Sequence, residues 1–217
     1  MAQKEDRKFV IVLGRQFGCG ARVIGKKVAA ALGIPYYDKE LLVKVANSTG
    51  VNEDYLAAGD ERSPYFSLSG LSVTMGFGAS SYLLGDPLLN KDSVYKAQSD
   101  VIRSLAESGS CLIVGRTADY ILRDHPRLIS IFIHASLDDR INRIIDRGDC
   151  ENADEAQEMA IKRNKMRANY YNFYTDRTWG DAATYDLTVN ASALGIDETV
   201  LLIVNYVKKR LERPDQP

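Results

Sequence analysis

Residues 10–38 read VIVLGRQFGCGARVIGKKVAAALGIPYYD, and this stretch decides the fold. A continuous apolar run is followed by a glycine-rich turn, a segment whose apolar residues have helical spacing, and a second short apolar run. Continuous apolar, β-branched runs are typical of strands that are buried on both faces of a parallel sheet. The stretch therefore predicts a strand, a turn, a helix and a second strand that ends near Asp38.

The glycine-rich turn has the features of a loop that holds a phosphate group. Gly18 and Gly20 can adopt backbone angles closed to other residues, which lets successive N–H groups face an anion. The helix that begins near Gly20 adds the positive end of its dipole and its unpaired N–H groups. The alternative is a tight strand-to-helix turn without a ligand, and the strand–loop–helix context favours phosphate binding.

Two positions of this turn depart from the usual phosphate-binding loop. Such a loop carries a lysine that reaches the terminal phosphates, followed by a serine or threonine that binds Mg²⁺. This chain has Ala21 and Arg22 at those positions. Because Ala21 has no donor, we expect Arg22, and after it Arg15, to supply the missing positive charge.

The rest of the chain repeats the alternation of apolar strands and helices. Strands are expected near residues 111–115, 128–135 and 185–191, and helices near 39–50, 92–109, 117–124, 136–148, 152–175 and 197–213. This order predicts a single α/β domain with a mainly parallel sheet covered on both sides. Residues 59–92 are rich in Gly, Ser and aromatic residues, which is consistent with a partly ordered lid, an oligomer contact or a packed irregular loop.

Charged residues cluster where ligands of such sheets bind, beyond the carboxyl ends of the strands. Arg116 and Asp119 follow the strand near 111–115, and they either contact a ligand or form a surface ion pair that caps a short helix. An arginine fork matches a phosphate, and a carboxylate can accept from a base or a ribose hydroxyl. Asp38 is a further candidate polar contact, or else a helix cap.

Two basic helices are further candidates for anion binding. Arg163 and Arg167 are four residues apart on one helix face, where like charges repel unless an anion lies between them. Lys162 and Lys165 are equally well explained as a solvated face. In the segment DDRINRIIDR, ion pairing explains most of the charges of Arg140, Arg143 and Arg147, although Arg143 and Arg147 could also reach a nucleotide.

The composition excludes several classes of protein. The net charge of −1 gives no bulk attraction to nucleic acid or to a membrane surface, and no apolar run approaches a membrane span. The aromatic residues within 170–179 are therefore expected to pack in the core and not to bind nucleic acid. The three dispersed cysteines are expected to be free thiols, and the charged N-terminus lacks a signal-peptide pattern, so we expect a cytoplasmic protein.

Four segments together resemble the cytidylate kinase-like family, a divergent branch of the P-loop nucleoside monophosphate kinases. They are GRQFGCGARVIGKKVAAALGIPYYDKELL (14–42), CLIVGRTADYIL (111–122), IFIHASLDDRINRI (131–144) and YYNFYTDRTWGDAATYDLTVNAS (170–192). The resemblance runs in order from about residue 9 to 207. It implies a three-layer P-loop kinase fold with a five-stranded parallel sheet, a nucleoside-monophosphate-binding region at about 38–92 and a lid at about 148–168.

The resemblance also implies a reaction, in which ATP phosphorylates CMP or dCMP to the diphosphate with Mg²⁺ held mainly by nucleotide oxygens and water. Arg22, Arg163 and Arg167 would be catalytic, and the acceptor nucleotide would contact Asp38, Arg116 and Asp119. The donor nucleotide would contact Arg15, Gly18, Cys19, Gly20, Ala21, Arg22 and Arg143. Asn164 stands where the lid of this branch often has an acidic residue.

Other interpretations of the sequence stay open. The chain is also consistent with a kinase of another small acceptor, or with a nucleotide-sensing or interaction protein that has little turnover. A third class is a structural module that forms homo-oligomers through residues 63–89. Diphosphate formation from a panel of nucleoside monophosphates identifies a kinase, binding without product favours a sensing or interaction protein, and no nucleotide binding favours the structural module.

Overall fold

The computed structural model describes residues 8–38 and 91–213, with side chains from residue 95 in the second range. The helix expected near 39–50, residues 59–90 of the insertion expected at 59–92, and most of the acceptor region at 38–92 lie outside these residues. In chain order the elements are β1 (Val10–Arg15), α1 (Ala21–Leu32), β2 (Tyr36–Tyr37), α4 (Lys91–Ser108), β3 (Cys111–Val114), α5 (Ala118–Ile121), β4 (Leu128–His134), α6 (Leu137–Asp146), α7 (Ala153–Thr175), the short 3₁₀ helix η2 (Ala182–Thr184), β5 (Leu187–Asn190) and α8 (Ala191–Glu212).

The five strands form one parallel sheet in the order β2-β3-β1-β4-β5. Strand β1 is central, so Val12 is paired with Ile113 on one side and with Ser130 on the other. The side chains of residues 10–13 are at most 1% exposed, as expected for a central strand covered on both faces. The predicted five-stranded parallel sheet is confirmed.

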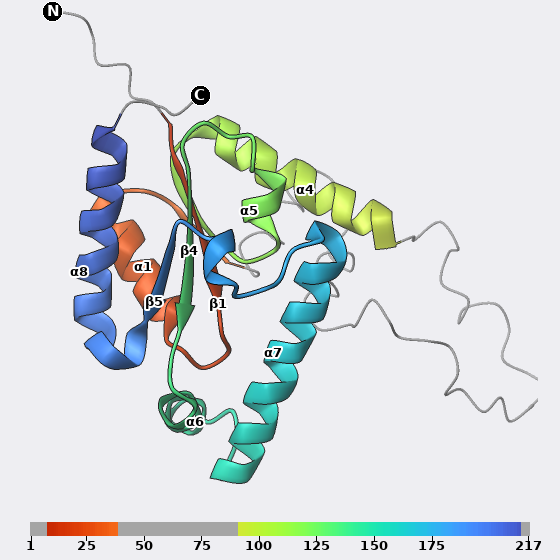
Figure 1. Ribbon diagram of the computed structural model, residues 1–217, viewed down its shortest axis with the longest axis vertical. Coiled ribbons are helices and arrows are strands. Elements are labelled where there is room, and N and C mark those ends of the chain that lie inside the picture. The colour runs from red at the N-terminus through yellow and green to blue at the C-terminus, as the bar shows by residue number, and fades with distance from the viewer. Residues whose placement is uncertain (1–7, 39–90, 214–217) are drawn as a thin grey trace, which may run out of the picture.

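Helices cover both faces of the sheet, giving three layers (Figure 1). Ile11 and Leu13 of β1 face a core shared with α1 and α8, whereas Val10 and Val12 face a core shared with α4 and α5. This division follows from the alternation of side chains along a strand. Helices α6 and α7 pack on each other through a smaller cluster, and α6 lies beyond the carboxyl end of β4 (Figure 1).

Two expectations from the sequence are corrected. The closing helix was expected at 197–213, but its helical segment begins at Ala191 and is broken at Gly195, whose φ is 73°. The aromatic residues of 170–179 do not all enter the core, because Phe173 is 49% exposed while Tyr171 is buried. Among the described helices, none combines the length and the apolarity that a membrane crossing requires.

Candidate functional site

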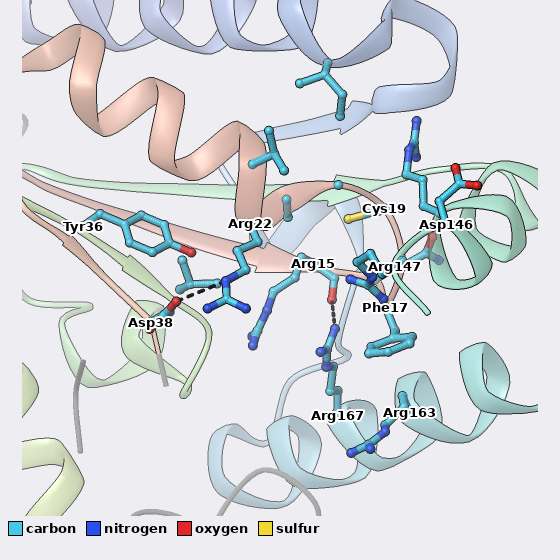
Figure 2. A pocket seen from close by; sticks show the side chains of 18 residues that line it. Arg15, Phe17, Cys19, Arg22, Tyr36, Asp38, Asp146, Arg147, Arg163 and Arg167 are labelled. Atoms are coloured by element: carbon cyan, nitrogen blue, oxygen red, sulfur yellow. Dashed lines mark hydrogen bonds and ion pairs between the residues drawn. The ribbon is translucent and has the colours of Figure 1, made fainter. Parts of the chain in front are cut away.

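A cavity of about 640 Å³ lies at the carboxyl edge of the sheet (Figure 2). The loop after β1 forms its floor, and the first turn of α1, the end of β2 and helices α6 and α7 form its walls. Six arginines line it, together with two carboxylates: Arg15, Arg22, Arg143, Arg147, Arg163, Arg167, Asp38 and Asp146. The structure thus gathers in one cavity ten of the twelve residues that the sequence nominated, all except Arg116 and Asp119.

The loop has the backbone geometry expected of an anion site. Gly18 and Gly20 have φ values of 80° and 86°, in the left-handed region that favours glycine. Gly20 is the N-cap of α1 and has no side chain that could accept from the N–H groups of the first turn. These N–H groups can therefore donate to an anionic ligand. Cys19 is buried in the core between these glycines, and burial raises the pKa of its thiol, so it acts there as a neutral packing group.

Gly18 is also required by its neighbour on α6. A Cβ at Gly18 would lie 2.8 Å from the carbonyl oxygen of Arg140. We expect Gly18→Ala to lower the free energy of unfolding by about 1.5 kcal/mol, because an L side chain is strained at this φ and meets this oxygen. Urea unfolding checks this, with Gly109→Ala as the control because nothing lies within 4 Å of its added Cβ. An equal loss of unfolding free energy in Gly18→Ala and Gly109→Ala would contradict a specific requirement for glycine at position 18.

Arg15 stands at the start of the loop, as the last residue of β1, and Arg22 stands just after it, in the first turn of α1. Arg22 extends from the first turn of α1 toward Asp38 after β2, with 3.6 Å between Nε and Oδ2 (Figure 2). The Arg15 guanidinium lies over Gly115, where a Cβ would overlap it. Arg22 therefore remains at the mouth of the cavity with more than half of its side chain exposed, while Arg15 reaches toward the end of β3.

Helix α7 is joined directly to the loop. The Phe17 N–H donates to Oδ1 of Asn164 at 2.8 Å, and Nη1 of Arg167 donates to the Arg15 carbonyl at 3.3 Å. Arg163 and Arg167 point into the cavity from this helix (Figure 2). Lys162 and Lys165 of the same helix are exposed, which confirms their interpretation as a solvated face.

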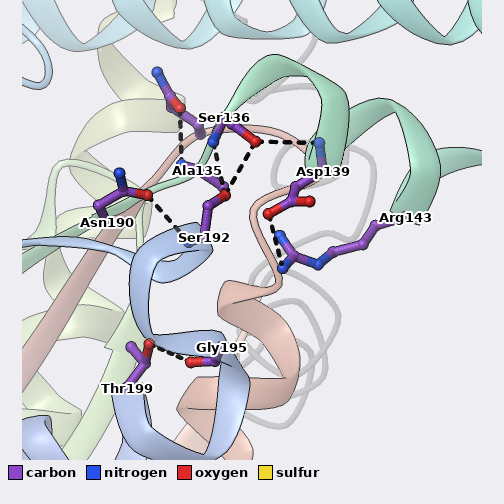
Figure 3. Close-up of polar contacts among 9 residues, drawn as sticks. Ala135, Ser136, Asp139, Arg143, Asn190, Ser192, Gly195 and Thr199 are labelled. Atoms are coloured by element: carbon purple, nitrogen blue, oxygen red, sulfur yellow. Dashed lines mark hydrogen bonds and ion pairs between the residues drawn. The ribbon is translucent and has the colours of Figure 1, made fainter.

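Arg143 of α6 and Ile196 of α8 line another part of the cavity. Figure 3 shows the polar contacts of these two helices near their N-termini. Ser136 caps α6 by accepting from the Asp139 N–H, and its own N–H donates to the Ser192 hydroxyl at 2.9 Å. Asp139 in turn lies 3.8 Å from Arg143, measured from Oδ2 to Nη2. The contact with Asp139 holds Arg143 near Gly20, where an added Cβ would lie 3.9 Å from its Nε, and Ile196 lies near the same glycine.

Arg140 has a place that the sequence did not predict. Ion pairing was expected to explain its charge, but the residue is only 8% exposed and lies behind Gly18. Its Nε and Nη1 have no hydrogen-bond partner within the part of the chain that the structure describes. Burial lowers its pKa, because a charge is costly away from water. A buried arginine behind the loop adds positive potential at the floor of the cavity.

Arg116 and Asp119 lie in a separate small chamber that borders the main cavity. Arg15 and Arg167 line both spaces, so they form the wall between them. Arg116 is 3% exposed and donates from Nη1 to Oε1 of Gln98 at 2.9 Å, and Asp119 is 6% exposed. Burial of both side chains excludes the exposed ion pair that the sequence also allowed.

Asp119 is expected to make stability depend on pH. Tyr171 donates to its carboxyl at 2.6 Å, yet burial raises its pKa above the ordinary value of 3.8. The folded state then binds the proton more tightly than the unfolded state, so stability falls as pH rises from 3.8 through the folded pKa. We expect Asp119→Asn to reduce this fall, since the amide is neutral and can still accept from Tyr171.

Urea unfolding between about pH 4 and pH 7 measures this dependence, taking the ordinary carboxyl range as the starting point. Asp124→Asn is the control, because the Asp124 side chain is 88% exposed. An identical slope for wild type and Asp119→Asn would contradict a pKa of Asp119 that burial raises in the folded state.

The acidic side chains that line the cavity are those of Asp38 and Asp146. Mg²⁺ prefers carboxylates, phosphates and water, but the loop has no hydroxyl at Arg22 and the Asp38 carboxylate faces that arginine. In residues 8–38 and 91–213 no group of three or more His, Cys, Asp or Glu side chains could hold a metal ion.

Known proteins resemble this chain in sequence and in fold. A curated cytidylate kinase from Saccharolobus islandicus (strain L.S.2.15 / Lassen #1) is 24% identical over 139 residues, which cover 60% of this chain and 72% of the relative. The crystal structure of an uncharacterized protein from Eubacterium ventriosum ATCC 27560 is similar, with a TM-score of 0.69, 29% identity and coverage of 93% of this chain and 99% of that one.

The fold is also shared with a shikimate kinase from Bacteroides thetaiotaomicron. Its structure has a TM-score of 0.54 at 14% identity and covers 95% of this chain and 100% of that one. At this identity the similarity shows the P-loop kinase fold alone. The sequence model of the cytidylate kinase-like family matches residues 10–193. The chain therefore belongs to the cytidylate kinase-like family.

Proposed function

We propose that this protein transfers the γ-phosphoryl group of ATP to a nucleoside monophosphate, with CMP or dCMP as the preferred acceptor. The observation that carries the proposal is the convergence of six arginines on a glycine loop at the start of a helix. Such a set of donors matches a polyphosphate, because phosphoryl transfer needs mainly positioning and stabilisation of charge. Family membership and the cytidylate kinases among its relatives support the choice of acceptor.

The donor is proposed to lie along the loop. Its phosphates would accept from the N–H groups between Gly18 and Arg22, and its base would lie at the end formed by Arg143 and Ile196. Arg22 and Arg15 would supply the charge that a lysine gives in other loops. Mg²⁺ is proposed to arrive on the nucleotide, held by phosphate oxygens and water.

The acceptor is proposed to approach from the side of Asp38, Arg116 and Asp119. An oxygen of its phosphate attacks the γ-phosphorus, the bond from that phosphorus to the β–γ bridging oxygen breaks, and ADP leaves with the electron pair. Arg163 and Arg167 lie on α7 where they can contact the transferred group. No protein nucleophile is needed for this direct transfer.

Incubation with ATP, Mg²⁺ and a panel of acceptors tests the proposal. We expect CDP or dCDP to form faster than the diphosphates of AMP, GMP and UMP. If only a non-nucleotide acceptor is phosphorylated, the proposed acceptor is wrong, whereas the proposal that the protein transfers a phosphoryl group stands.

The second candidate function is nucleotide binding with little turnover, and the loop itself favours it. Ala21 and Arg22 replace the lysine and the hydroxyl that assist transfer in other P-loop proteins. This alternative predicts that ATP binds in calorimetry while no acceptor of the panel yields product. The proposed homo-oligomer is independent of both functions and is tested by light scattering.

A further inference from the structure

Phe17 is the apolar residue of the glycine loop, and its ring leaves the loop to pack between α6 and α7. It contacts the small hydrophobic cluster of these helices, whose buried members are Ile141, Ile144, Ala156 and Ala160. Its backbone N–H is held by Oδ1 of Asn164. Both its side chain and its backbone therefore join the loop to α7, across 147 positions of sequence.

Three arginines surround the ring of Phe17. The guanidinium carbons of Arg147, Arg167 and Arg163 lie 5.2, 5.4 and 5.9 Å from its centroid. Arg147 comes from the end of α6 and the other two come from α7, and all three line the cavity. One ring is thus the shared contact of three cations from two elements (Figure 2).

The electrostatics of a phenyl ring explains this arrangement. Three like charges repel each other, and the negative face of an aromatic ring attracts each of them within about 6 Å. A guanidinium that lies over a ring keeps its N–H donors in its own plane, where they remain available to a phosphate. An aliphatic side chain of similar volume would fill the same space in the cluster without this attraction.

We propose that Phe17 is a positioning residue, which holds Arg147, Arg163 and Arg167 together at the polyphosphate end of the cavity and couples the loop to α7. Its role in binding of polyphosphate needs only the cavity, whereas its role in turnover rests on the proposed kinase activity. The experiment therefore measures binding of a simple polyanion first, and turnover second.

The probe is inorganic tripolyphosphate, titrated by calorimetry into wild type, Phe17→Leu and Phe17→Tyr. We expect Phe17→Leu to bind it about tenfold more weakly, equivalent to about 1.4 kcal/mol, and Phe17→Tyr to bind it within about twofold of wild type. Adenosine affinity is expected to stay unchanged in both variants, because only the arginines are displaced. Phe173→Leu is the matched control, since Phe173 is half-exposed on α7, the helix that carries Arg163 and Arg167, and lies outside the cavity.

A series of ring-fluorinated phenylalanines at position 17 separates positioning from packing. Fluorine withdraws charge from the ring face with little change of shape, so a residue that only fills space would show no trend. We expect tripolyphosphate affinity to fall steadily with the number of fluorines, whether or not Phe17→Leu folds well. Equal affinity across the folded members of the series would overturn the proposal.

Turnover separates this proposal from the proposed function. If wild type makes CDP, kcat is expected to fall along the same series by more than the KM for ATP rises. If wild type makes no diphosphate, but tripolyphosphate affinity falls with the number of fluorines across the series, the kinase assignment fails while the role of Phe17 stands. If wild type makes CDP but neither tripolyphosphate affinity nor kcat changes along the series, the kinase assignment stands and the proposed role of Phe17 fails.

Discussion

Arg167→Ala is expected to lower kcat by about a hundredfold or more, the loss seen when a charge clamp is removed from phosphoryl transfer. Arg167 lies over the Phe17 ring and donates to the Arg15 carbonyl. It lines both the main cavity and the small chamber of Arg116 and Asp119. A side chain that lines both spaces can contact the phosphoryl group in transit. Its loss should therefore affect the transition state more than the binding of either substrate.

Steady-state kinetics with ATP and CMP measures this effect. The KM for ATP should change by less than about threefold, because an interaction made mainly in the transition state lowers kcat and kcat/KM together. Lys162→Ala is the control, since Lys162 is exposed on the same helix and does not line the cavity. An unchanged kcat in Arg167→Ala would remove Arg167 from the mechanism.

Arg22→Ala is expected to weaken ATP binding by about 2 kcal/mol, or about thirtyfold, the loss of one charge-assisted contact. Arg22 occupies the first turn of α1 beside the loop, where its long side chain can turn from Asp38 toward the phosphates. Asp38 holds it at the mouth of the cavity before the ligand arrives. The replacement of lysine by arginine at a neighbouring position is then compatible with a working phosphate cradle.

Calorimetric titration of ATP and of adenosine into wild type, Arg22→Ala and Arg15→Ala tests this replacement. Adenosine affinity should be the same in all three proteins, because the arginines are proposed to contact only phosphates. Arg15→Ala should have the smaller effect on ATP, since its guanidinium lies over Gly115. Equal ATP affinity in the three proteins would exclude arginine as the substitute for lysine.

The sequence predicted the sheet and the loop because their signals are local. The apolar run at 10–13 and the glycines at 18 and 20 are short patterns whose structure depends on nearby residues. Arg22, Arg163 and Arg167 were predicted to bind an anion from equally local features, which are their distance from strand ends and their spacing along helices. The structure brings them into one cavity, as these features predict.

The contacts missed by sequence analysis connect distant segments. Phe17 is a single apolar residue in a loop, and nothing near it indicates that its ring packs on α6 and α7. Arg140 has the periodicity of a surface arginine, yet the missing side chain of Gly18 lets α6 approach and bury it. Arginine is so seldom buried that a sequence pattern assigns it to the surface. Such residues become visible only when the fold brings the elements together.

Transfer of label from [γ-³²P]ATP tests the central claim most directly. Wild type with CMP and Mg²⁺ is predicted to form CDP that carries ³²P in its β-phosphate, and Arg167→Ala is predicted to form about a hundredfold less in the same time. Label that stays in ATP, or appears only as inorganic phosphate while CMP is unchanged, would contradict the claim that this cavity transfers a phosphoryl group to a nucleoside monophosphate.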